Sequence, residues 1–152
     1  MKNNQIYIRR VEFKDQALLL NWANQQVLEK TKINTRKLIK IEEHKKWFLK
    51  ILKDQNSYLW IIYNNTKPIG QLRIEWRKNN HEIDIFITKE FRKFGLGSAA
   101  LKKGLEKLKQ DNHKKIIARV KGNNKVSKKF FKNFGFKVLE LNDDDLSYIY
   151  YF

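Results

Sequence analysis

The chain has 152 residues, a length that suits one domain, residues 1–152, with a hydrophobic core of its own. Cysteine is absent, which excludes disulfides and thiolate sites, and no stretch suits a membrane span or an export signal, so we expect a cytoplasmic protein without membrane or metal partners. The formal net charge of +17 disfavours polycationic substrates, while the scattered lysines and the lack of a recognised motif argue against a nucleic-acid partner.

Apolar residues in the first half of the chain recur in patterns that predict strands and two helices. We expect a strand at Gln5–Arg9, then a helix that Asp15 caps and that ends near Gln26, and a loop at Thr31–Lys40. Strands at 58–63 and 69–76 follow. Before them, a helix beginning at Ile41 carries one face of large side chains: Ile41, His44, Trp47, Phe48, Ile51 and Leu52.

The second half interleaves strands with two further helices. We expect strands at 81–87, 115–120, 136–141 and 147–152, and a loop at Asn142–Asp145. One helix ends near Gln110, and another runs from Asn124 to a C-cap at Gly135 with an apolar stripe of Val126, Phe130 and Phe134. Helices interleaved with strands in this way predict a mixed sheet that is covered on both faces.

A basic turn with two glycines joins the strand that ends at Ile87 to the next helix. Its sequence is Arg92-Lys93-Phe94-Gly95-Leu96-Gly97-Ser98. The first N–H groups of a helix lack intrahelical partners, and the helix dipole favours negative charge beside them. The glycines let a ligand approach the backbone, and the two basic residues add mobile positive charge. We therefore expect the turn to hold a phosphate group, although it is neither a P-loop nor a dinucleotide fingerprint.

A second stretch, NKVSKKFFKNFGF from Asn124 to Phe136, follows downstream. Together the two stretches resemble the GNAT N-acetyltransferase family, in which an Arg/Gln-x-x-Gly-x-Gly/Ala turn binds acetyl-CoA. In that family a later helix, opened by Asn and closed by Gly-Phe, lies beside the pantetheine arm. The resemblance spans nearly the whole chain and implies an α+β GNAT fold of three α/β/α layers. It also implies a mixed, mostly antiparallel sheet of six to seven strands, four helices, and acetyl-CoA as cosubstrate.

The resemblance also assigns the residues that contact acetyl-CoA. The main chain at Ile87 should face the thioester where its strand splays from the neighbouring one, the turn should hold the pyrophosphate, and Asn124 should lie beside the pantetheine. The expected cofactor-binding residues are Phe86, Ile87, Arg92, Lys93, Phe94, Gly95, Leu96, Gly97, Ser98, Asn124, Ser127 and Phe131. From the sequence pattern alone, Asn124 is also a helix cap, and the two roles are compatible.

The proton donor and the base are less directly indicated. Many GNAT relatives protonate the departing thiolate with a tyrosine at the position of Phe131, and phenylalanine cannot do so. Water or another tyrosine, such as Tyr150, would then serve. Asp84 is the candidate base because it lies on the strand face opposite the isoleucines, where a carboxylate needs water or a partner. Glu82 is the alternative, and a salt bridge from Asp84 to Arg73 explains the same pattern equally well.

The N-terminal third resembles one branch of the family, the UDP-4-amino-sugar N-acetyltransferases of the pseudaminic acid pathway. His44 and Trp47 match a His and an aromatic residue that contact the nucleotide in that branch, and Lys30 is the nearest match to its arginine. An aromatic plane suits uracil, and an imidazole suits a phosphate or a ribose hydroxyl. A packed core role for His44 and Trp47 remains the alternative.

The expected reaction is therefore N-acetylation of a small-molecule amine, with an anionic nucleotide sugar as acceptor. The competing acceptors are a ribosomal-protein N-terminus and an aminoglycoside, and the positive charge disfavours the latter. A non-catalytic acetyl-CoA-binding module is the alternative from another class. The sequence leaves open whether the chain forms a homodimer.

Overall fold

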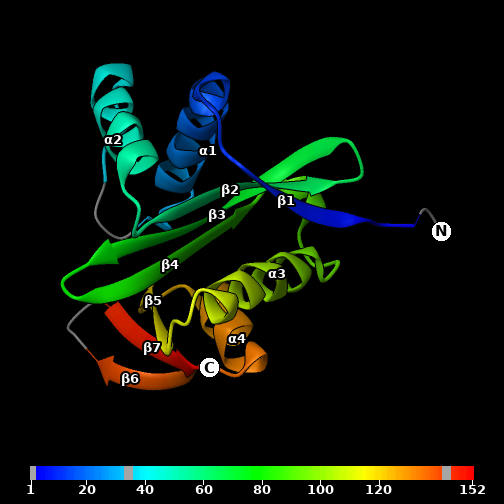
Figure 1. The fold of residues 1–152 in the computed structure, drawn as a ribbon, viewed down its shortest axis with the longest axis vertical. Helices are drawn as coiled ribbons and strands as arrows, with labels where there is room; N and C mark the ends of the chain where they lie inside the picture. The colour runs from blue at the N-terminus through cyan, green and yellow to red at the C-terminus, as the bar shows by residue number, and fades with distance from the viewer. Residues whose placement is uncertain (1–2, 33–35, 142–144) are drawn as a thin grey trace.

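The computed structural model describes residues 3–32, 36–141 and 145–152. In this part of the chain, a seven-stranded sheet is covered by two helices on each face (Figure 1). Helices α1 (Gln16–Leu28) and α2 (Ile41–Lys53) cover one face. Helices α3 (Leu96–Gln110) and α4 (Lys125–Phe134) cover the other. The predicted three-layer α+β arrangement is confirmed.

The strands run in the order β1-β2-β3-β4-β5-β7-β6, and every neighbouring pair is antiparallel except β4 and β5. Short 3-10 turns at Phe13–Asp15 and Lys89–Phe91 follow β1 and β4. The strand bounds are β1 Ile6–Arg10, β2 Tyr58–Asn64, β3 Lys67–Arg77, β4 Asn80–Ile87, β5 Lys115–Lys121, β6 Lys137–Leu141 and β7 Asp145–Tyr151. They agree with the predicted strands to within about two residues at each end.

The parallel pair β4–β5 is short and then diverges. Only Glu82 with Ile117 and Ile83 with Ala118 are paired among the described residues. The rest of β4, from Asp84 to Ile87, continues beside β3 without a partner in β5. One edge of the backbone in the middle of the sheet is therefore open to a ligand.

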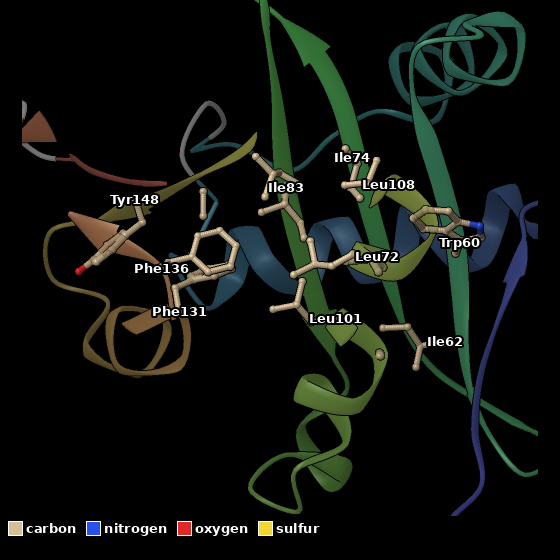
Figure 2. Packing of buried hydrophobic residues seen from close by; sticks show 14 of the residues in the cluster. Trp60, Ile62, Leu72, Ile74, Ile83, Leu101, Leu108, Phe131, Phe136 and Tyr148 are labelled. Atoms are coloured by element: carbon tan, nitrogen blue, oxygen red, sulfur yellow. The ribbon is translucent and has the colours of Figure 1, made fainter. Parts of the chain in front are cut away.

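Two hydrophobic clusters fill the two faces of the sheet. The larger lies under α3 and α4 and includes Leu72, Ile83, Leu101 and Phe131 (Figure 2). The smaller lies under α1 and α2 and includes Leu19, Trp22, Phe48 and Phe86. Strand β4 sends its isoleucines into the first cluster and Phe86 into the second, as the alternating sequence predicts.

The ends of the first two helices differ from the prediction in detail. Asp15 stands before α1 without capping it, because its carboxylate pairs with Arg9 at 3.0 Å and accepts the Glu12 N–H at 2.7 Å. Helix α1 also continues past Gln26 to Leu28. Ile41, the first residue of α2, is 56% exposed.

The predicted loop at Asn142–Asp145 lies largely outside the described residues. Its last residue, Asp145, begins β7 and lies 3.3 Å from the Arg119 guanidinium. Residues 33–35 of the predicted loop at Thr31–Lys40 also lie outside them. None of the helices in the described ranges has the length and apolar character that a membrane crossing requires.

Candidate active site

A cavity of about 1010 Å³ lies where β4 separates from β5. The turn before α3, the start of α3 and one face of α4 line what we call the α3–α4 side, with Arg92, Lys93, Gly95, Leu96, Gly97, Ser98, Asn124, Val126, Ser127, Phe130 and Phe131. Residues of α1, α2 and β3, with Thr31 and Lys32, line what we call the α1–α2 side. The open edge of β4 from Asp84 to Ile87 lies between the two sides.

The glycine turn on the α3–α4 side has the conformation that anion binding requires. Lys93 and Gly95 adopt positive φ angles of 70° and 76°, so that the chain turns sharply into α3. The N-cap is Gly95, and no side chain caps the helix or places an acid in its first turn. A Cβ on Gly97 would lie 3.4 Å from the Phe130 ring and 3.6 Å from Ile87, both in the cavity lining. The first N–H groups of α3 are thus available to a ligand.

Arg92 does not add the mobile positive charge that the sequence predicts. Its guanidinium forms a two-point ion pair with Glu29 at the end of α1, with N–O distances of 2.9 and 3.0 Å. Its Nε donates to the Ile87 carbonyl oxygen at 2.7 Å, and the group lies over the Phe86 ring. Arg92 therefore joins α1 to the end of β4, and Lys93 supplies the cation that lacks such a partner among the described residues.

Helix α4 presents an apolar surface to the cavity. Asn124 caps it by accepting the Ser127 N–H at 3.1 Å, as predicted, and both residues line the cavity. Phe131 is the buried residue of the helix, between the rings of Phe130 and Phe136. The predicted stripe is divided: Val126 and Phe130 line the cavity, whereas Phe134 packs against Phe136 and Tyr150. Val126 is 74% exposed because no protein element covers it.

The lining contains no tyrosine among the described residues. Tyr150, the predicted alternative proton donor, packs against Phe134, Phe136 and Phe152 on the far side of α4. Phe131 lines the cavity but carries no proton to give. Any proton that a leaving group needs must therefore come from water or from another polar residue.

A polar stripe along β3 forms the wall on the α1–α2 side, and sequence reasoning missed it. Gln71, Arg73, Glu75 and Arg77 occupy alternate positions and all line the cavity. Leu72 and Ile74, which lie between them, are in the core under α3. The signal was present in the sequence, because a strand covered on both faces should not alternate apolar and charged residues unless one face meets water.

The two candidate bases both line the cavity and both have basic neighbours. Asp84 is the first residue of β4 beyond the last pair with β5. Its Oδ2 accepts from Gln71 Nε2 at 3.2 Å and lies 3.7 Å from the Arg73 guanidinium. Glu82 lies 3.9 Å from Arg119 on β5. The predicted contact between Asp84 and Arg73 is present, and the carboxylate is oriented toward the cavity by two neighbours.

His44 and Trp47, one turn apart on α2, both lie in the wall with their rings 5.2 Å apart. His44 is 4% exposed, and its Nδ1 has no hydrogen-bond partner among the described residues. Burial, with Lys32 and Arg73 nearby, lowers the pKa of His44 to about 4, so the imidazole is neutral at pH 7. The Trp47 indole lies against the Arg73 guanidinium and donates to Glu75 Oε1 at 3.4 Å.

Two predicted site residues, both within the described ranges, lie outside the lining. Phe94 points away, with 68% of its surface exposed. Lys30 has a positive φ of 59° at the end of α1, and its carbonyl accepts from Lys121 Nζ. The turn there directs Lys32, two residues later, into the cavity in place of Lys30.

The sequence profile described as "Acetyltransferase (GNAT) family" matches residues 20–136, about three quarters of the chain. The chain belongs to the acetyltransferase (GNAT) family. The match includes the glycine turn, the open edge of β4 and the whole of α4. Membership makes this GNAT domain an acyltransferase that uses acetyl-CoA as its cosubstrate.

The chain is also similar to a curated relative and to solved structures from other organisms. An uncharacterized protein of Methanocaldococcus jannaschii is 32% identical over 143 residues, which cover 90% of this chain and 29% of that protein. The GNAT domain thus spans less than a third of the length of this curated relative. The crystal structure of a domain from M. jannaschii has a TM-score of 0.86 and 27% identity, covering 99% of this chain and 100% of that one.

The spermidine N-acetyltransferase of Vibrio cholerae, solved in complex with CoA and spermine, superposes with a TM-score of 0.79. It is 18% identical, and the match covers 97% of this chain and 95% of that one. At this identity the likeness shows a shared GNAT fold.

Proposed function

We propose that this GNAT domain transfers the acetyl group of acetyl-CoA to the amine of a UDP-linked 4-amino sugar. This acceptor is of the kind used by the pseudaminic-acid-pathway branch that the N-terminal third resembles. The observation that carries the proposal is that one cavity joins a main-chain anion site to a wall of basic, aromatic and imidazole side chains. The first suits the cofactor pyrophosphate, and the second suits a nucleotide.

The cofactor lies, in this proposal, along the α3–α4 side. The unpaired N–H groups at Leu96, Gly97 and Ser98 hold the pyrophosphate, with Lys93 beside them. The apolar surface of α4, including Val126 and Phe130, covers the pantetheine arm and loses its exposure in doing so.

The main chain at Ile87 supplies the oxyanion contact. The N–H of Thr88 donates to Ile69 on β3, so the polar groups of Ile87 point to the opposite side, into the gap beside β5. The Arg92 bond to the Ile87 carbonyl fits this direction. An N–H fixed in this gap stabilises the negative charge that develops on the thioester oxygen.

The reaction proceeds by direct attack. The lone pair of the neutral amine forms a bond to the thioester carbonyl carbon, the C–S bond breaks, and the CoA thiolate leaves. The proton released from the nitrogen passes to Asp84, which lies at the junction of the two sides. Water protonates the thiolate, since the tyrosine used by many relatives is Phe131 here. Placement of the two substrates contributes most of the rate.

The acceptor occupies the α1–α2 side. Because His44 is neutral, its imidazole suits a hydroxyl of the ribose or the sugar better than a phosphate. Trp47 supplies an aromatic surface for the base. The chain's formal net charge of +17 disfavours polyamines and aminoglycosides as acceptors.

The test is a comparison of acceptors by release of free CoA thiol from acetyl-CoA. The acceptors are a UDP-4-amino sugar, the same amino sugar without UDP, a ribosomal N-terminal peptide, spermidine and kanamycin. We expect the UDP-linked sugar to have the highest kcat/KM, and His44→Ala to raise its KM about tenfold while leaving acetyl-CoA affinity unchanged.

A higher kcat/KM for the peptide, spermidine or kanamycin would overturn the nucleotide-sugar assignment. Acetyl-CoA binding without turnover of any of these amines would instead favour a non-catalytic acetyl-CoA-binding module. Lys45→Ala, an exposed residue next to His44 that does not line the cavity, is the matched control.

A further inference from the structure

We propose that Arg73 and Lys32 form a subsite for the diphosphate of the acceptor, separate from the pyrophosphate site of the cofactor. This inference rests on the proposed function, because it names the groups that would hold the anionic part of a nucleotide sugar. The two residues come from β3 and from the segment after α1, and both line the α1–α2 side of the cavity.

Arg73 is a largely buried cation without a close partner. Its side chain is 17% exposed, and within the described residues its guanidinium donates no hydrogen bond. Glu75 and Asp84 are its nearest carboxylates, at 3.6 and 3.7 Å, which is too long for a good N–H···O bond. The planar fork of an arginine is suited to two oxygens of one phosphate, and here it is still available.

The neighbouring carboxylates are held by other donors. Glu75 Oε1 accepts from Trp47 Nε1, and its Oε2 forms an ion pair with the Arg77 guanidinium at 3.1 Å but has no hydrogen-bond donor among the described residues. Asp84 accepts from Gln71 Nε2. Glu43 also lines this side, from the first turn of α2. These contacts keep Glu75 and Asp84 from closing on Arg73, so its charge is only partly compensated.

Lys32 adds a second cation with no carboxylate within 4.0 Å in the described residues. Burial and the neighbouring Arg73 lower the pKa of Lys32. Burial, with Lys32 and Arg73 nearby, also lowers the pKa of His44. The three groups therefore lie within electrostatic reach of one another and repel additional positive charge. A doubly charged anion between them would remove this repulsion and satisfy the free N–H donors of Arg73.

The chemistry fits a phosphate-bearing small molecule. The groups lie inside a single cavity that also holds Trp47 and His44, as a nucleotide requires. They lie on the side of β4 opposite α3, whose N-terminus is reserved for the cofactor. Saturating CoA will therefore fill the cofactor site and leave this one free for a probe.

The experiment is an isothermal titration of the CoA-saturated protein with UDP and, separately, with inorganic pyrophosphate. The variants are Arg73→Gln, Arg73→Lys and Lys32→Met. Lys46→Met, an exposed cation on α2 outside the cavity lining, removes the same charge as a control. We expect Arg73→Gln and Lys32→Met each to weaken UDP binding about tenfold or more, and Lys46→Met to change it less than about twofold. Arg73→Lys should lie between them, because it keeps the charge and loses the fork.

The possible results test the subsite and the proposed function separately. UDP binding that is unchanged in Arg73→Gln and Lys32→Met overturns the subsite and leaves the nucleotide acceptor standing. Pyrophosphate binding that depends on Arg73, with UDP binding no tighter than pyrophosphate, supports an anion subsite but contradicts a nucleotide acceptor. No binding of either probe to the wild type overturns both. Because Arg73 lies on a central strand, unchanged CoA affinity of its variants is the check that they still fold. Lys32 lies outside every helix and strand, so Lys32→Met tests the subsite independently of the sheet.

Discussion

The two sides of the cavity are built in different ways. The α3–α4 side is made mainly of backbone: a glycine turn, the start of a helix and the open edge of β4. The α1–α2 side is made of side chains that meet from α1, α2, β3 and the segment around Lys32. A site made of backbone fixes the sequence only in a short segment that must keep its conformation. A site made of side chains can be built from many different combinations of residues. The first can therefore be common to a family, and the second can differ from one acceptor to another.

The largest expected effect is a loss of acetyl-CoA affinity from a change on the α3–α4 side alone. Gly97→Glu places a side chain and a negative charge beside Phe130 and Ile87, where we place the pyrophosphate. Like charge and steric overlap there cost several kcal/mol, which is roughly a thousandfold in acetyl-CoA affinity. Calorimetry should show this loss, while UDP binding on the other side is retained. Unchanged acetyl-CoA affinity would show that the cofactor pyrophosphate does not bind at this turn. Gly97→Ala is the control for added bulk.

The second prediction concerns the α1–α2 side and the loss of folding stability in acid that His44 causes. The pKa of His44 is about 4 in the folded protein against an ordinary value of 6.5, so the unfolded chain binds more protons between these values. Stability from this group is therefore full above pH 6.5 and falls as the pH drops to 4, by about 3 kcal/mol in total. Denaturant unfolding at pH 7 and pH 4 should show a smaller acid loss in His44→Gln than in the wild type. An equal loss in both would mean that His44 is not held neutral.

The third effect lies at the junction of the two sides. Asp84→Asn should lower kcat about a hundredfold if Asp84 accepts the proton of the amine, and should remove the acidic limb of the pH–rate profile. A residue that served only as the partner of Arg73 would change stability and KM instead. The measurement is the pH dependence of kcat for wild type and variant, with Glu82→Gln as the matched carboxylate control. A retained acidic limb in Asp84→Asn would rule out this role.

The smallest effect is expected at Phe131. Its ring is packed against Phe130 and Phe136, so a hydroxyl added at this position has little freedom to reach the thiolate. Phe131→Tyr should keep the fold and change kcat by less than about tenfold. Steady-state kinetics and thermal unfolding are sufficient to measure it. A gain of a hundredfold would show that the pocket can orient a tyrosine donor after all.

The same contrast explains what could be predicted from the sequence. The strands, the glycine turn and the Asn124 cap are encoded by neighbouring residues, and the structure places them as expected. The pairing of Arg92 with Glu29 could not be predicted, because 63 positions separate the two residues. The stripe of charged residues on β3 was visible as an alternation, but its meeting with Lys32 and Trp47 depends on the packing of α2 over the sheet. The apolar stripe of α4 was predicted as a pattern, but a pattern does not show which of its residues pack against protein, as Phe134 does, and which face a cavity, as Val126 does.

Strand β3 has a consequence for how such a domain diversifies. Its even-numbered residues, Leu72 and Ile74, lie fully buried under α3, and its odd-numbered residues from Gln71 to Arg77 face the cavity. Mutation can therefore exchange the odd positions and alter what the domain acetylates while the even positions keep the core intact. A library randomised at Gln71, Arg73 and Glu75 would sample new acceptors on an unchanged scaffold. The alternation of a single strand thus separates the evolution of specificity from the maintenance of the fold.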